Sequence, residues 1–320
     1  MLDLYGIQVA FGGLRAVDDV TIHIAPGSRH ALIGANGAGK STLLHVAAGA
    51  IRPTAGRVML GDRDVTGWAP HRRARAGIGR TFQQPALLRR ESCLSNVAAA
   101  VWRRDGGGFA LLTRPARRRA VAAEAHRRLA EVGLTGRATK PAGQLSHAQQ
   151  RQLELAIALA GRPDLLLLDE PAAGLARPDL ARLSELIRDL PAELTVLLVD
   201  HDLDLVFDLA TMVTVLDRGR VVLTAPPAEV WADARAAEVY LGPSVPPEST
   251  LDGGSGYIRR TGAVNGASTG TSRGGLAPGV VDGVRRRSHG GPAPTGVRRG
   301  SVGGRRPGSL GGSAGDGESR

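Results

Sequence analysis

Residues 29–48 contain the feature that constrains the fold most: a short apolar stretch, a glycine-rich loop and the start of a helix follow one another directly. We predict a buried strand over residues 29–33 and a helix over residues 41–48. The loop between them reads GANGAGKST over residues 34–42 and matches the pattern G-x-x-x-x-G-K-[ST]. A strand that passes through a tight loop into a helix is typical of α/β folds, so the sequence predicts this class.

The residue types in this loop suit a phosphate group. Gly34, Gly37 and Gly39 let the backbone wrap closely, so that N–H groups point at phosphate oxygens, and the next helix presents its positive end to them. Lys40 would neutralise the β- and γ-phosphates of a nucleotide, and Ser41 would offer its hydroxyl to Mg²⁺. A glycine-rich turn with a chance lysine is the alternative, which the flanking strand and helix disfavour. The predicted nucleotide contacts are Gly34, Asn36, Gly37, Ala38, Gly39, Lys40, Ser41 and Thr42.

Two carboxylates and a histidine follow two further predicted strands. Residues 165–168 form an apolar run that is followed by Asp169 and Glu170. Residues 195–199 form another, and one residue separates it from His201. Continuous apolar runs are typical of parallel strands covered on both faces. Asp169 would hold Mg²⁺, Glu170 would orient or deprotonate the attacking water, and His201 would donate to the γ-phosphate. Alone, each is more often a solvated acid or a structural histidine; with the phosphate loop, they predict ATP hydrolysis.

The remaining pattern completes an α/β fold. Residues 16–24 alternate apolar and polar side chains, as a half-exposed strand does, and residues 56–60 with the turn at 61–62 indicate a hairpin. Residues 85–161 are predicted to be mostly helical, and residues 117–132 carry apolar side chains at helical spacing. We therefore expect a helical block inserted between the phosphate loop and the later strands.

A further stretch, LSHAQQ at residues 145–150, identifies a family. With the preceding motifs it resembles the ATP-binding subunits of ABC transporters, whose signature usually reads LSGGQ. Ser146 and Gln149 form an S-x-x-Q capping box that would open a helix reaching Ala160. In this family that helix start faces the γ-phosphate held by a second ATP-binding subunit, so the resemblance implies a homo- or heterodimer with ATP between the two chains. The residues implied to contact this nucleotide are Ser146, His147, Ala148 and Gln149.

The resemblance also assigns roles to residues outside the signature. Gln83, in RTFQQ, looks like the glutamine that joins the Mg²⁺ site to the helical subdomain, with Gln84 as the less favoured register. Phe11 looks like the aromatic residue that stacks on adenine, and a core phenylalanine is its alternative. The implied catalytic residues are Glu170, His201 and Gln83, and the implied metal ligands are Ser41, Gln83 and Asp169.

The resemblance implies an α/β fold: a P-loop NTPase (ABC ATPase) core with an antiparallel β subdomain and an inserted α-helical subdomain at about residues 85–160. Within the family, several segments look like the branched-chain amino-acid branch: FGGLRAVDDV, GIGRTFQQPALL, QLELAIALA, DEPAAGL, HDLDLVF and VYLG. Residues 103–118 fit the longer segment that this branch carries before its signature. The implied partners are transmembrane permease subunits and, indirectly, a substrate-binding protein, at the cytoplasmic face of the membrane. Urea importers and a lipopolysaccharide-export ATPase are the alternatives.

Three departures from the family pattern concern the rate of turnover. Ala148 replaces the second signature glycine, and its methyl group would crowd the phosphate or restrict the backbone, although alanine accepts helical geometry well. Asp200 stands where this branch usually has glutamate before the histidine. Ala176 and Arg177 replace the Asn or Asp that is common after GL. None of these changes removes a group that the chemistry needs.

The composition changes after Gly242. Residues 243–320 hold 21 glycines, 11 arginines and 5 acidic residues, and such a segment cannot bury enough apolar surface to offset its ordering entropy. We therefore expect an ABC ATP-binding domain over residues 1–242 and a disordered tail over residues 243–320. Its arginine clusters would suit acidic lipid headgroups or RNA, but charge runs alone are weak signals, so nucleic acid is not an expected partner.

General features set limits on other functions. The single cysteine, Cys93, excludes a disulfide framework, and neither a secretory signal nor an apolar run of about 20 residues is visible, so we expect a soluble subunit. A soluble ABC ATPase acting on ribosomes or DNA usually shows two cassettes or a long coiled-coil insertion. A phosphate-loop kinase would not explain the signature or His201. A cassette that binds ATP without hydrolysing it is the third alternative.

Overall fold

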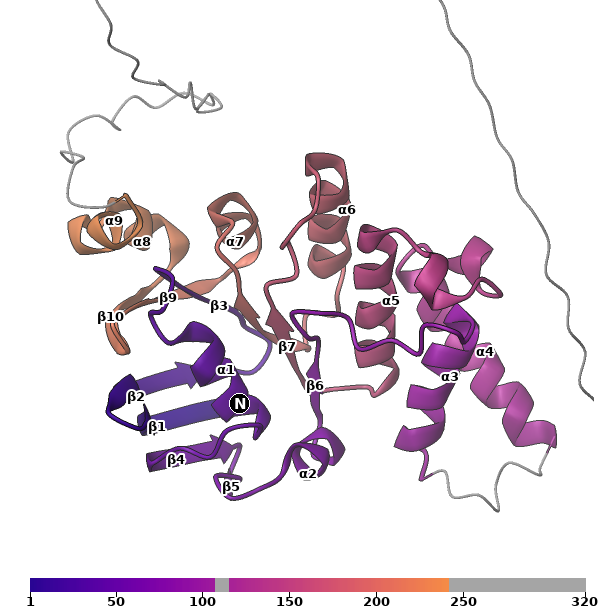
Figure 1. The fold of residues 1–320 in the computed structure, drawn as a ribbon, viewed down its shortest axis with the longest axis horizontal. Helices are drawn as coiled ribbons and strands as arrows, with labels where there is room; N and C mark the ends of the chain where they lie inside the picture. Colours follow the sequence, from indigo (N-terminus) through magenta and orange to yellow (C-terminus); the bar gives the residue numbers. More distant parts are fainter. Residues whose placement is uncertain (107–114, 242–320) are drawn as a thin grey trace, which may run out of the picture. The chain divides into compact units, whose positions relative to one another are not determined.

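A six-stranded sheet forms the centre of the fold in the computed structural model, which describes residues 1–106 and 115–241 (Figure 1). In order across the sheet, the strands are β10 (Arg220–Ala225), β9 (Met212–Asp217), β3 (Arg29–Gly34), β8 (Thr195–Val199), β7 (Leu165–Asp169) and β6 (Ile78–Arg80). All neighbouring pairs are parallel except the antiparallel pair of β9 and β10. The predicted strands at residues 29–33, 165–168 and 195–199 are confirmed as three neighbours in this sheet.

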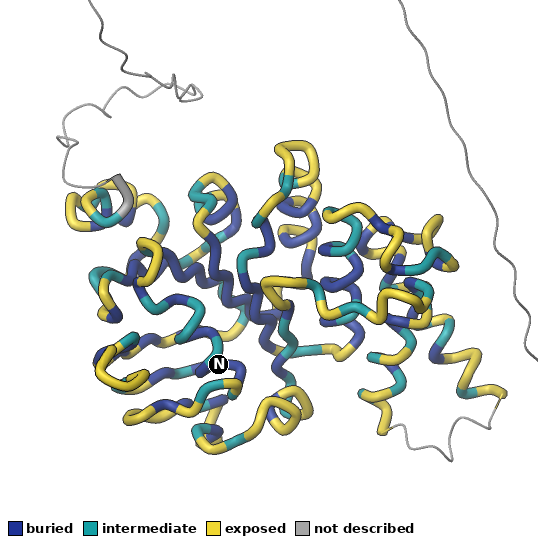
Figure 2. Tube along the Cα trace, viewed as in Figure 1, coloured by how far each residue is buried: buried dark blue, intermediate teal, exposed yellow. Residues whose placement is uncertain are grey.

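Leucine and valine side chains cover both faces of the inner strands. Along β7, Leu165 and Leu167 pack into one hydrophobic core, whereas Leu166 and Leu168 pack into the other. This is the alternation that a strand imposes, and it explains why a strand buried on both sides reads as a continuous apolar run. Figure 2 shows these central strands buried along their length.

A second, antiparallel sheet and one helix cover the first face. The sheet contains β2 (Leu14–Ile24), β1 (Leu2–Phe11), β4 (Ala55–Leu60) and β5 (Arg63–Asp64), in this order. Helix α1 (Lys40–Ala48) contributes Leu43, Leu44 and Val46 to the core that these strands share with the central sheet. The predicted hairpin is confirmed as β4 and β5, and the predicted helix as α1.

Helices cover the second face of the central sheet. The inserted block holds α3 (Cys93–Arg104), α4 (Pro115–Glu131) and α5 (His147–Ala160), and α6 (Arg177–Arg188), α7 (Leu203–Leu209), α8 (Pro227–Ala232) and α9 (Ala234–Leu241) follow. The short α2 (Pro70–Arg75) precedes β6. In α4, Val121, Ala125 and Leu129 are buried four residues apart, as the predicted helical pattern requires.

The fold class predicted from the sequence is thus confirmed: an α/β core, an antiparallel β part and inserted helices. The segment 103–118 falls only partly within the described residues, and the tail at residues 243–320 lies outside them. Among helices in the described ranges, none combines the length and the apolar character that crossing a bilayer requires.

His30 makes the stability of the central sheet depend on pH. This buried side chain lies on β3, and its Nε2 is 2.7 Å from Oγ1 of Thr214 on β9. Burial, together with the smaller effect of the His23 charge, lowers the pKa of His30 from its ordinary 6.5 to about 4. The unfolded chain therefore binds this proton more readily than the folded one, so the contribution is complete above pH 6.5 and is lost as the pH falls toward 4.

Between pH 6.5 and pH 4, we expect the free energy of unfolding of the wild type to fall by up to about 3 kcal/mol more than that of His30→Gln. Glutamine remains neutral over this range, so the variant removes this titration while other acid titrations continue in both proteins. Urea unfolding followed by circular dichroism at several pH values measures the difference. Parallel curves of stability against pH for the two proteins would contradict this prediction.

Candidate functional site

The parallel pairing of β3, β8 and β7 brings three functional loops to one edge of the sheet. Strand β8 lies between the other two, and Val199 pairs with Leu32 of β3 and with Asp169 of β7. The loops that leave the carboxyl ends of these strands therefore begin side by side, which is where ligands bind in open α/β sheets. The phosphate loop, the acidic pair and the segment around His201 meet at this edge.

The phosphate loop needs glycine because the backbone packs against other chain segments. Gly34 has φ of 150°, and a Cβ atom there would lie 2.1 Å from the carbonyl oxygen of Leu216. Gly39 has φ of 99°, and its Cβ would lie 2.5 Å from the carbonyl oxygen of Ala16. No side chain caps the N-terminus of α1, so the first N–H groups of this helix are available to an anion.

Lys40 extends its ammonium group over the same loop. Its Nζ donates to the carbonyl oxygens of Gly34 and Ala35 at 2.8 and 2.9 Å. Burial lowers the pKa of Lys40, and the nearby charge of Glu170 opposes that shift. The predicted phosphate contacts at residues 34–42 thus span the loop and the first residues of α1, and the Lys40 ammonium group is hydrogen-bonded to the loop backbone.

Asp169 ends β7 as a buried carboxylate with one oxygen unsatisfied. Its Oδ2 accepts from Nη2 of Arg80 at 3.2 Å and lies 3.7 Å from Nε2 of His45. Its Oδ1 is buried without a hydrogen-bond partner among the described residues. Leaving a buried carboxylate oxygen without a partner is costly, and an oxygen-seeking cation such as Mg²⁺ would satisfy it. Asp169, one of the three predicted metal ligands, therefore offers a free carboxylate oxygen that suits a cation, and the assignment of Ser41 and Gln83 remains a prediction.

Glu170 adopts a backbone conformation that side chains rarely take. Its φ is 46°, in the left-handed region, and its N–H donates to the carbonyl of Val199 at 2.8 Å. Nε2 of Gln83 donates to Oε2 of Glu170 at 3.0 Å, so the structure brings together two residues predicted to act in catalysis. Non-glycine residues at positive φ cluster at active sites, where neighbouring contacts hold them.

Two charged residues of α5 hold the segment that carries Gln83, and sequence analysis did not single them out. The Arg151 guanidinium donates to the carbonyls of Phe82 and Gln83 at 2.7 and 2.5 Å, and Glu154 accepts from the N–H of Phe82 at 2.6 Å. Arg151 and Glu154 form a buried ion pair at 3.3 Å. Burial raises the pKa of Glu154, and its hydrogen bonds oppose this. The available signal was a pair of opposite charges three residues apart, with Glu154 standing inside the apolar stretch of α5 that starts at Leu153.

Asp200 connects the segment around His201 to the loop after Glu170. Its buried carboxylate accepts from the N–H groups of His201, Asp202 and Ala172 at 2.7, 3.0 and 3.0 Å. Burial raises the pKa of Asp200, whereas these hydrogen bonds lower it. The His201 ring is mostly exposed, with Nδ1 3.6 Å from the Asp200 carboxylate. Asp200, which is shorter than the glutamate usual at this position, thus joins two loops through its hydrogen bonds.

The signature stretch begins α5 as predicted. Ser146 is the N-cap: its Oγ accepts from the N–H of Gln149 at 3.3 Å, and Oε1 of Gln149 accepts from the N–H of Ser146 at 3.2 Å. The predicted capping box is confirmed. Ala148 lies inside α5, where alanine is favourable and no glycine is needed. In the described part of the chain, no hydrogen bond or ion pair joins residues 145–149 to residues 34–42.

Phe11 ends β1 with half of its surface exposed, at 50%. The alternative that it is a core residue is wrong, because a core side chain would be covered on all sides. A flat, exposed ring at a strand end is free to stack on a ligand. The assignment to adenine remains a prediction.

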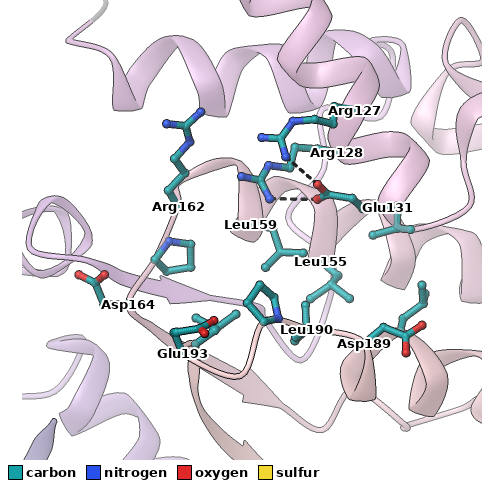
Figure 3. A pocket seen from close by; sticks show the side chains of 15 residues that line it. Arg127, Arg128, Glu131, Leu155, Leu159, Arg162, Asp164, Asp189, Leu190 and Glu193 are labelled. Atoms are coloured by element: carbon teal, nitrogen blue, oxygen red, sulfur yellow. Dashed lines mark hydrogen bonds and ion pairs between the residues drawn. The ribbon is translucent and has the colours of Figure 1, made fainter. Parts of the chain in front are cut away.

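A cavity of about 650 Å³ lies away from these loops (Figure 3). It is lined by α4, α5 and the connection between α6 and β8, and the guanidinium groups of Arg127 and Arg128 pair with Glu131 on one side of it. None of the predicted nucleotide, metal or catalytic residues lines it. The candidate site therefore lies at the carboxyl ends of β3, β8 and β7 and not in this cavity.

A phosphate loop, an acidic strand end and a histidine segment at one edge of a parallel sheet define a P-loop nucleotide hydrolase. The model of a family described as "ABC transporter" matches residues 17–173. The high-affinity branched-chain amino acid transport ATP-binding protein BraF of Pseudomonas aeruginosa is 36% identical over 250 residues, covering 76% of this chain and 98% of the relative. The corresponding LivG of Escherichia coli K12 is 34% identical over 249 residues, with the same coverage.

Solved structures agree with these sequence relatives. A crystal structure of the ADP conformation of an ATP-binding cassette of an ABC transporter is 28% identical, with a TM-score of 0.66, covering 76% of this chain and 98% of that one. The chain belongs to the ATP-binding subunits of ABC transporters. It is an ATPase with the P-loop ABC ATPase fold.

Glycine at position 170 should separate stability from activity. We expect Glu170→Gly to be more stable than Glu170→Gln by about 1 kcal/mol, because glycine accepts φ of 46° without strain. Both variants lack the carboxylate, so kcat for ATP should fall by about 10²-fold or more in each. Thermal unfolding and phosphate release measure the two effects.

The matched control is the exposed Glu193, which is not among the residues with positive φ. There the order should reverse, with Glu193→Gly less stable than Glu193→Gln by about 0.5–1 kcal/mol. If glycine destabilises both positions equally, the backbone of Glu170 stores no strain.

Proposed function

We propose that this chain is the ATP-hydrolysing subunit of an importer for branched-chain amino acids. The observation that carries the proposal is the coverage of BraF and LivG, because this chain matches 98% of each relative at 36% and 34% identity. The chain would act at the cytoplasmic face of the membrane, bound to transmembrane permease subunits. A separate binding protein would deliver the amino acid to the permease.

The phosphate loop would bind ATP through backbone N–H groups, with Lys40 on the β- and γ-phosphates and Phe11 stacked on adenine. The contacts proposed along the loop are Gly34, Asn36, Gly37, Ala38, Gly39, Lys40, Ser41 and Thr42. Ser41, Gln83 and Asp169 would hold Mg²⁺, which supplies positive charge to the phosphate oxygens. The unsatisfied Oδ1 of Asp169 supports this assignment.

Glu170 would orient the attacking water and accept its proton, and His201 would donate to the γ-phosphate. The hydrogen bond from Gln83 supports this role, because it holds one carboxylate oxygen of Glu170 at 3.0 Å. The contacts of Arg151 and Glu154 with residues 82 and 83 would transmit movement of the inserted helices to this carboxylate.

A second ATP-binding subunit, identical or related, would complete each site. Ser146, His147, Ala148 and Gln149 lie at the start of α5, with no hydrogen bond to the phosphate loop of the same chain in the described residues. A helix start with its positive end outward suits an anion presented by another chain. This arrangement supports a dimer with ATP between the signature of one subunit and the phosphate loop of the other.

Other substrates are the alternatives that a test must separate. An iron(III) import ATP-binding protein of Streptomyces coelicolor is 38% identical, with 67% of that relative covered, and a ribose import ATP-binding protein of Rubrobacter xylanophilus is 36% identical, with 47% covered. Urea import and lipopolysaccharide export remain family alternatives. A soluble ABC ATPase acting on ribosomes or nucleic acid would depend on the arginine-rich segment 243–320, outside the described residues.

Deleting the gene in its host should strongly lower uptake of radiolabelled leucine, isoleucine and valine at low external concentration, with urea, ribose and iron uptake unchanged. Wild-type protein should restore uptake, and Glu170→Gln should not, because its kcat is expected to fall by about 10²-fold or more. Unchanged leucine uptake in the deletion strain would refute the substrate assignment. ATP hydrolysis by the purified chain tests the motor separately.

A further inference from the structure

His147 connects the start of the signature helix to the loop that follows Glu170 in the same chain. It is the first residue of α5, and its Nε2 lies 3.1 Å from the carbonyl oxygen of Ala173. Because a carbonyl can only accept, Nε2 carries the proton and donates. This side chain therefore links the inserted helical block to the α/β core at the functional edge of the sheet.

The receiving loop is shaped for this contact. Gly174 has φ of 74°, and a Cβ atom there would lie 3.4 Å from Nε2 of His147, so the imidazole lies directly against the loop. The N–H of Ala173 donates to the carbonyl of Glu170 at 3.1 Å, which forms a tight turn. On the other side, Asp200 accepts from the N–H of Ala172 at 3.0 Å. The loop is thus held between two side chains, one from α5 and one from the end of β8.

We propose that His147 is a positioning residue that couples the two ATP sites of the dimer. The inference rests on the proposed function, in which Ser146 serves the nucleotide held by the partner subunit and Glu170 serves the nucleotide held by its own chain. Ser146 is adjacent to His147, and Ala173 is one turn beyond Glu170, so the His147–Ala173 hydrogen bond sets the relative position of the two groups. Closure of one site would then shift the hydrolytic carboxylate of the other.

Substituting leucine or glutamine at position 147 separates the effect of the hydrogen bond to Ala173 from the effect of side-chain packing. His147→Leu keeps a side chain of similar bulk but cannot donate, whereas the Nε2 of His147→Gln can donate to the same carbonyl. His126→Leu is the matched control, because His126 is an exposed histidine of α4 outside the proposed machinery. The measurements are the affinity for a fluorescent ATP analogue, the kcat and the Hill coefficient for ATP, and hydrogen exchange of a peptide spanning residues 171–176.

We expect the phosphate loop of His147→Leu to bind the analogue with wild-type affinity in dilute, unpaired subunits, because the nucleotide contact proposed for residue 147 is made only to the partner subunit's site. Its kcat should fall several-fold, its Hill coefficient should move toward 1, and the loop amides should exchange about threefold to tenfold faster, the factor that loss of one hydrogen bond gives. His147→Gln should recover all three values, and His126→Leu should match the wild type. A fall in kcat without recovery in His147→Gln would overturn the proposal.

The outcomes also distinguish the inference from the function on which it rests. If the wild type hydrolyses ATP, Glu170→Gln does not, and His147→Leu matches the wild type in exchange and cooperativity, the coupling role is wrong and the motor stands. If Glu170→Gln hydrolyses ATP at the wild-type rate, the proposed function itself fails at that residue.

Discussion

The position of β8 between β3 and β7 is the constraint on which the rest of the site depends. Parallel neighbours end at the same edge, so the pairing of Val199 with Leu32 and Asp169 aligns three loops that are far apart in the sequence. A slip of one residue in any of these strands would turn its side chains to the opposite face and move its loop. Leucine and valine on both faces fix the register, because each face is buried in a separate hydrophobic core.

Side chains from other elements then hold these loops in place. Arg151 and Glu154 of α5 bind the backbone at residues 82 and 83, and Asp200 binds the backbone at residues 172, 201 and 202. Burying such charges is unfavourable unless they are paired and hydrogen-bonded, and each has several partners here. Because these partners are backbone groups of the functional loops, the buried charges fix loop geometry as well as satisfying one another.

Sequence reasoning reached the parts of the fold that rest on local patterns. The strand, loop and helix at residues 29–48 and the capping box of Ser146 and Gln149 were predictable because spacing alone defines them. Strand β1 was not predicted, since Gly6 has φ of 55° and the pairing with β2 shifts register, which breaks the alternation. The hairpin of β9 and β10 was missed because Arg218 occupies its turn. This position has a positive φ, and such positions usually hold Asn or Asp, which makes a turn recognisable in a sequence.

In the candidate site, too, some residues could be predicted from the sequence and others could not. Lys40, Asp169 and Glu170 carry chemistry that a motif describes, so the sequence indicated them. The contacts of Arg151 and Glu154 with residues 82 and 83, and that of Asp200 with Ala172, join groups 28 to 72 positions apart in the chain, and only the folded structure pairs them. Position 200 shows the difference most clearly, because an apparent departure from the family pattern becomes a hydrogen-bond hub once its partners are known.

The electrostatics of this edge argue for the kind of ligand it takes. The uncapped start of α1 and the ammonium of Lys40 favour an anion, whereas the unsatisfied oxygen of Asp169 and the carboxylate of Glu170 favour a cation beside it. A simple anion would satisfy the first pair and leave the carboxylates facing added negative charge. A polyphosphate accompanied by a divalent cation would satisfy both, because Asp169 would hold the cation while Lys40 and the start of α1 would hold the phosphates. The charge pattern thus favours a nucleoside polyphosphate with its divalent cation, a specificity that the glycine loop alone does not provide.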